Sequence, residues 1–114
     1  MSLKALVILL IGMIYYSDMS DMNKKTYEAD AIILGAYAKN SRADKALRLS
    51  LGIYVKTGFV ENSVASIEYR GKIIQRLLKD FNVHEHSRLK GKKAKAYIEI
   101  RFNKLVGISP TSPI

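Results

Sequence analysis

Strict alternation of apolar and polar positions marks the clearest element of the chain, residues 46–56. From Arg48 onward its even-numbered residues are polar, glycine or tyrosine, whereas its odd-numbered residues are all leucine, isoleucine or valine. Successive side chains of a strand point to opposite faces of a sheet, so this period of two predicts a half-buried strand. Residues 64–69 are predicted to return as the second strand of a hairpin, after a loop that begins at Thr57 and Gly58.

Two other segments carry apolar residues at helical spacing. In residues 73–81 the isoleucines, leucines and phenylalanine fall on one stripe and the basic and amide residues on the other, which predicts an amphipathic helix. Residues 27–39 are rich in alanine and place Ile32, Ile33, Ala36 and Tyr37 at helical spacing. Asn40 and Ser41 supply a stop, so we expect a second helix there.

A second hairpin is predicted from residues 83–89 and 94–102 around a lysine- and glycine-rich turn. Its second strand would bury Ala96, Ile98, Ile100 and Phe102. The element order helix-ββ-α-ββ predicts an α+β fold: an antiparallel sheet from two β-hairpins joined by an amphipathic helix, with one face covered by helices and an extra N-terminal apolar element.

The chain divides into three parts by composition. Residues 1–25 form an apolar element and an acidic linker, residues 26–105 a basic α+β domain, and residues 106–114 a flexible C-terminal tail. The apolar run, residues 5–16, is too short to span a bilayer, which needs roughly 20 residues. We expect it to be a helix buried in the core or at a homodimer interface. A buried strand and membrane contact are the alternatives, because periodicity does not separate a short apolar helix from a buried strand.

Positive charge is confined to the later part of the chain. Residues 1–38 hold three lysines and four acids, whereas residues 39–114 hold sixteen basic residues and six acids, within a net charge of +9. Such a footprint indicates a partner with many negative charges, above all nucleic acid, DNA or RNA. The chain has no cysteine, which excludes disulfides and thiolate metal sites and fits a cytoplasmic location.

Two groups of residues are candidates for binding nucleic acid. The open sheet face is expected to offer cations for phosphates and aromatic rings for bases. Its members are Arg48, Tyr54, Lys56, Tyr97 and Arg101. A lysine-rich hairpin is expected to follow a phosphate backbone with Arg88, Lys90, Lys92, Lys93 and Lys95. The sequence therefore predicts a small non-enzymatic nucleic-acid-binding protein. The alternative is a membrane-associated or structural interaction protein that uses residues 3–16.

His84 and His86 are weak metal candidates. On a strand, residues i and i+2 share a face, as in the His-x-His motif of rolling-circle and relaxase-type nucleases. Those enzymes place a hydrophobic residue between the histidines, where this chain has Glu85. We therefore expect a structural or solvent-exposed histidine pair, no metal and no cofactor.

The predicted order of elements over residues 27–104 resembles the repeat unit of LAGLIDADG homing endonucleases. Leu34, Gly35 and Ala36 match the small positions through which the first helices of that family pack. The resemblance implies a shared fold. It implies only a degenerate nuclease, our third hypothesis, because Asn40 occupies the position of the metal-binding acid and supplies no anionic ligand.

Overall fold

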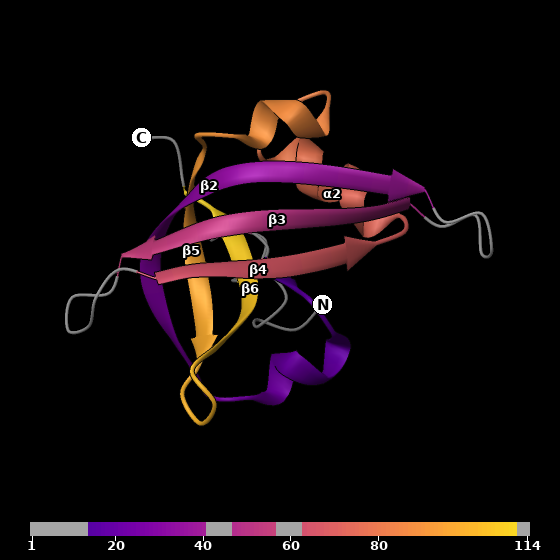
Figure 1. Ribbon diagram of the computed structural model, residues 1–114. Coiled ribbons are helices and arrows are strands. Elements are labelled where there is room, and N and C mark those ends of the chain that lie inside the picture. Colours follow the sequence, from indigo (N-terminus) through magenta and orange to yellow (C-terminus); the bar gives the residue numbers. More distant parts are fainter. Residues whose placement is uncertain (1–13, 41–46, 57–62, 112–114) are drawn as a thin grey trace, which may run out of the picture.

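A curled antiparallel sheet forms most of the protein (Figure 1). The computed structural model describes residues 14–40, 47–56 and 63–111. Their six strands lie in the order β1-β6-β5-β2-β3-β4 and curl into a half-barrel. The elements are β1 (Tyr15–Tyr16), the 3₁₀ helix η1 (Met19–Asn23), β2 (Thr26–Asn40), β3 (Leu47–Lys56), β4 (Ser63–Arg70), α2 (Ile73–Asp80), the 3₁₀ helix η2 (His86–Leu89), β5 (Lys93–Glu99) and β6 (Lys104–Pro110).

The prediction of a helix over residues 27–39 is wrong, because this segment is the long central strand β2. Its first half pairs with β5 and its second half with β3. Ala29, Ala31 and Ile33 face the core, and a β-bulge follows Ile33. Beyond the bulge Ala36 faces inward, so two inward residues are three positions apart. A β-bulge adds one residue to a strand and breaks its period of two, which here imitates helical spacing.

The predicted fold class is therefore wrong as well. The sheet is not covered by helices on one face, and α2 is the single α-helix among the described residues. Ile74, Leu77 and Phe81 carry its apolar stripe into the core that the inner faces of the strands form. The resemblance to LAGLIDADG endonucleases fails for the same reason, because Leu34 is exposed on a strand rather than packed between helices.

Three predicted elements are confirmed. The strand over residues 46–56 is β3, the strand over 64–69 is β4, and the amphipathic helix over 73–81 is α2. The inward residues of β3 are fully buried, namely Leu49, Leu51, Ile53 and Val55. Strict alternation thus located this strand and its buried face, since no bulge interrupts its pairing with β4.

The second predicted hairpin is wrong. Residues 83–89 form a loop and η2 instead of a strand, and Leu89 is buried. β5 pairs with β2 on one side and with β6 on the other. Ile100 and Phe102, predicted to be buried, are exposed because the chain turns between β5 and β6. Residues 106–110, which the sequence analysis placed in the tail, belong to β6.

The two edges of the sheet, β1 and β4, approach each other and nearly close the half-barrel. The Tyr69 hydroxyl of β4 donates a hydrogen bond to the backbone carbonyl of Tyr15, 2.5 Å away. The Tyr15 hydroxyl donates to the Asp80 carboxylate on α2. We call this junction the seam. Residues 1–13 lie outside the described part of the chain, so of the predicted apolar element only its end, which forms β1, is described.

Candidate functional site

Three cations stand side by side on the outer face of β2, β3 and β4. Lys39 is opposite Arg48 in the β2–β3 pairing, and Arg48 is opposite Arg70 in the β3–β4 pairing. Cβ atoms of directly opposed residues are about 5 Å apart, so the three side chains start within about 10 Å of one another. We call these three residues the cationic row.

The carboxylate of Glu68 lies beside the cationic row. Glu68 Oε1 lies 4.0 Å from Arg48 Nε and 3.8 Å from Arg70 Nε. The row and Glu68 together carry two excess positive charges. Like charges that face each other across strands destabilise a sheet. An anion bound over the row would relieve that repulsion.

Two tyrosines lie on the outer face beyond the cationic row. Tyr37 is opposite Ser50, and its side chain is 69% exposed. Gly52 lies between Gly35 and Ser66, and a Cβ atom on Gly52 would be 4.0 Å from the Cβ atom of the exposed Leu34. Tyr54, which is half-buried, lies two residues further along β3. The outer face thus offers two tyrosine rings with Gly52 between them along the sheet.

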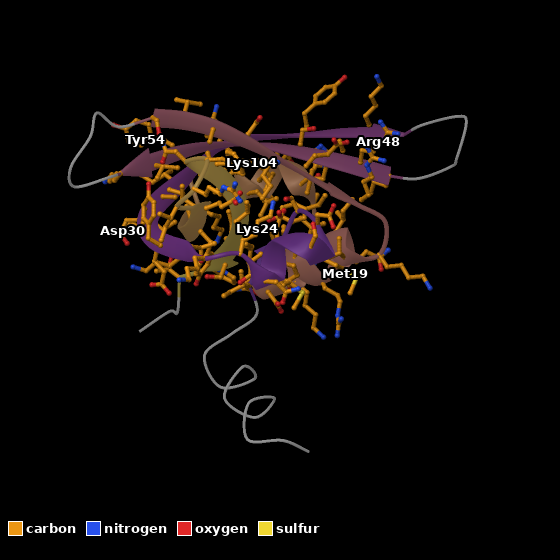
Figure 2. The ribbon with its side chains drawn as sticks, turned by 90° about the horizontal axis from the view of Figure 1, so that it is seen from below. Met19, Lys24, Asp30, Arg48, Tyr54 and Lys104 are labelled. Carbon is orange, nitrogen blue, oxygen red and sulfur yellow. The ribbon has the colours of Figure 1, made fainter. Side chains whose placement is uncertain are left out.

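Further cations lie at the opposite end of the same face. Lys56 is opposite Asp30, which in turn is opposite Lys95. The Lys95 ammonium group donates a hydrogen bond to Asp30, 2.7 Å away, which lowers the pKa of that carboxyl. Lys56 and Lys93 line a hollow of about 220 Å³ with Asp30. Figure 2 shows Arg48 and Tyr54 well separated along the sheet. Arg48 and Lys56 are eight positions apart along β3, or about 26 Å.

The structure gathers half of the residues predicted for the site. Arg48, Tyr54 and Lys56 share the outer face of β3, and Lys93 and Lys95 lie beside them on β5.

The other predicted residues lie elsewhere. Tyr97 is buried, with its hydroxyl 3.0 Å from Ser109 Oγ. Arg101 lies in the β5–β6 turn, with its guanidinium carbon 5.2 Å from the centre of the Phe102 ring. Arg88 is in η2, near Glu85. Lys90 and Lys92 follow in a turn that leads into β5, so the predicted lysine-rich hairpin does not exist.

The histidine pair has no strand to hold it. His84 precedes η2 and His86 is its first residue, so the argument from strand geometry does not apply. No group of three or more histidine, cysteine or acidic residues in the described part of the chain is placed to hold a metal ion.

Sequence reasoning missed Tyr37, Lys39 and Arg70. Tyr37 and Lys39 were assigned to a helix, and Arg70 lies one residue beyond the predicted strand. A usable signal for Arg70 was present, because Val64, Ser66, Glu68 and Arg70 continue the outward positions of β4. Lys39, Arg48 and Arg70 lie opposite one another because of the register of β2, β3 and β4. That register cannot be read from the three sequence segments taken separately.

A groove of about 810 Å³ lies at the seam between η1, β4 and the start of β6. Asp21 is buried there and accepts hydrogen bonds from Ser17 Oγ at 2.6 Å and from Lys24 Nζ at 3.1 Å. Burial opposes ionisation of Asp21, yet these bonds lower its pKa below the usual value. Lys24 also lies 3.6 Å from the buried Glu99. These ion pairs thus neutralise much of the charge in the groove. The outer face is therefore the stronger candidate for a binding site.

No protein-family model, curated protein or solved structure matches this chain. None of the helices in the described ranges is long and apolar enough to cross a membrane.

Proposed function

We propose that this protein is a non-enzymatic binder of single-stranded nucleic acid, DNA or RNA, and that it binds on the outer face of β2, β3 and β4. The observation that carries the proposal is the cationic row beside the exposed ring of Tyr37. Proteins that bind single strands combine cations along the backbone path with aromatic rings on which bases stack. The outer face has both.

Charge supports a polyanionic partner. The chain carries a net charge of +9, and three of its basic residues stand side by side in the cationic row. Each phosphate that a lysine or arginine neutralises releases condensed counterions from the nucleic acid, which favours binding at low salt. The repulsion within the row is relieved in the same step.

The spacing of Tyr37 and the row supports a single strand. Tyr37 and Lys39 are two residues apart on the same face of β2, about 6.6 Å along the strand. A base stacked on Tyr37 would place its own phosphate near Lys39 or Arg48. Bases in a duplex are already stacked on one another, whereas single-stranded bases are free to stack on aromatic side chains.

Two parts of the proposal rest on sequence alone. We expect a homodimer joined through residues 3–16, most of which lie outside the described residues. A cytoplasmic location is likewise inferred from the absence of cysteine.

A salt titration tests the proposed function. Fluorescence anisotropy with labelled DNA and RNA of about 12 nucleotides, single-stranded and duplex, would measure affinity. With about three phosphate contacts, we expect affinity for single strands to fall roughly 100-fold per tenfold rise in salt. Absence of binding at low salt to all four nucleic acids would rule out the proposed function.

Replacing Tyr37 with alanine tests the stacking surface. Loss of one stacked base should weaken binding of single strands by about 1–3 kcal/mol, or roughly 5-fold to 150-fold. Val64→Ala is the matched control, because Val64 is 67% exposed on the same face but has no ring. Equal effects of the two substitutions would mean that Tyr37 does not stack a base.

A further inference from the structure

Exposed apolar side chains gather at the end of the half-barrel where η1 leads into β2 and β5 turns into β6. Met19, Met22, Ile100 and Phe102 are each between 58% and 82% exposed. We call these four residues the apolar tip. Figure 1 shows η1 and the β5–β6 turn at the same end of the molecule.

Two hydrogen bonds join the β5–β6 turn to the residues that follow η1. The backbone N–H of Ile100 donates to the carbonyl of Lys25, 3.1 Å away. The Tyr27 hydroxyl donates to Asn103 Oδ1, also 3.1 Å away. The turn that carries Ile100 and Phe102 is thus held against the start of β2, and Lys25 lies beside it.

Cations surround the apolar tip. Lys24, Lys25, Arg101 and Lys104 are exposed, and the Arg101 guanidinium lies over the Phe102 ring. Asp21 and Glu99 are buried and lie within 3.6 Å of Lys24, whereas Asp18, which precedes Met19, is exposed. Figure 2, which looks onto this end, shows Lys24 and Lys104 near the centre of the view and Met19 to one side. The β5–β6 turn is therefore apolar at Ile100 and Phe102, with the exposed cations Lys25, Arg101 and Lys104 around these two side chains.

This combination has a chemistry that the outer face lacks. Nucleic acid would pair with the cations, but it offers no apolar layer for the side chains of methionine and isoleucine. An anionic bilayer offers both, with phosphate and carboxylate groups above an apolar interior. Apolar side chains ringed by lysine and arginine bind such surfaces by entering the boundary between headgroups and acyl chains.

We propose that the apolar tip docks on anionic lipid membranes, with Ile100 and Phe102 entering the headgroup layer and Lys25, Arg101 and Lys104 on lipid phosphates. This surface is distinct from the one proposed for nucleic acid. Each cation near an anionic bilayer strengthens binding by about fivefold. Membrane association should therefore depend on both anionic lipid and the apolar side chains.

Vesicle co-sedimentation tests the proposal. The full chain should sediment with phosphatidylcholine vesicles that contain phosphatidylserine and should remain in solution with phosphatidylcholine alone. The double variant Ile100→Ser, Phe102→Ser should lose at least tenfold in affinity. Val64→Ser, which removes a similarly exposed apolar side chain from the outer face, should bind as the wild type does. A wild type that stays in solution with the anionic vesicles, or a double variant that binds unchanged, would overturn the proposal.

A tryptophan reporter separates insertion from adsorption by charge alone. The chain contains no tryptophan, so Phe102→Trp introduces the only one. Its emission should shift to the blue on binding anionic vesicles and be quenched by lipids brominated on the acyl chain. Val64→Trp should show neither effect. Quenching of both reporters, or of neither, would contradict docking through the apolar tip.

Discussion

Alanine in place of both Lys39 and Arg70 should weaken the binding of single-stranded nucleic acid by roughly tenfold to 100-fold at low salt. Each lost phosphate contact reduces the slope of log affinity against log salt by about 0.7. The slope measured for the double variant should therefore be shallower than the wild-type slope by about 1.4. Arg48 remains in the double variant. The Glu68 carboxylate, which lies near both Arg48 and Arg70 in the wild type, then no longer has Arg70 beside it. The residues that remain, Arg48 and Glu68, carry opposite charges.

The control for this variant must carry the same change in net charge. Lys79 of α2 and Lys90, which precedes β5, are exposed and lie off the outer face. Lys79→Ala combined with Lys90→Ala should leave affinity and salt slope near the wild-type values, as measured by fluorescence anisotropy. Equal losses in the two double variants would show that binding follows net charge and not the cationic row.

How much of the fold the sequence predicts depends on whether its periodicity is interrupted. β3 has no bulge against β4, so alternation located it and its buried face. β2 has a β-bulge after Ile33. The inward-facing residues before and after the bulge, Ile33 and Ala36, are three positions apart, which is a helical spacing. Because the topology is built around β2, one misassigned segment changed the predicted fold class.

β6 was missed for a different reason. Both of its faces are buried, so no alternation marks it, and its glycine, serine and proline are typical of a tail. Gly107 has a structural role, because a Cβ atom there would lie 3.0 Å from the Tyr15 carbonyl oxygen and 3.2 Å from the Tyr16 ring. The approach of β1 to β6 requires this glycine, and that long-range contact is not visible in a local pattern.

The sequence predicts the members of the candidate site that lie on a single strand, but not how residues of neighbouring strands come together. Arg48, Tyr54 and Lys56 follow from the alternation of β3 alone. The cationic row depends on which residues of β2 and β4 face Arg48, and that register is set by tertiary packing. Tyr97 was also expected on the open face, but it is buried on β5 and hydrogen-bonded to Ser109. Exposure of a strand residue depends on what else covers the face.

Stability should fall steeply above about pH 10, because the seam holds buried tyrosine hydroxyls in their neutral form. Burial raises the pKa of Tyr69 well above its usual value of about 10. Burial and the hydrogen bond to Asp80 raise the pKa of Tyr15 in the same direction. Above pH 10 the unfolded chain releases these protons and the folded chain keeps them, so rising pH favours unfolding. Below pH 10 both states are protonated and the contribution is constant.

Each such tyrosine should lower the free energy of unfolding by about 1.4 kcal/mol per pH unit above pH 10. Urea unfolding of the wild type and of Tyr69→Phe, measured from about pH 8 to about pH 11, would show this. At neutral pH the variant should be less stable by about 1–3 kcal/mol, because the Tyr15 carbonyl loses a donor in a buried seam. Above pH 10 the stability of Tyr69→Phe should fall less steeply than that of the wild type, by about 1.4 kcal/mol per pH unit, so the two stabilities should converge as pH rises.

Tyr37→Phe is the control, because the Tyr37 ring is exposed, and this variant should keep the wild-type dependence of stability on pH. Parallel curves for Tyr69→Phe and the wild type would show that the Tyr69 hydroxyl is not held neutral at the seam.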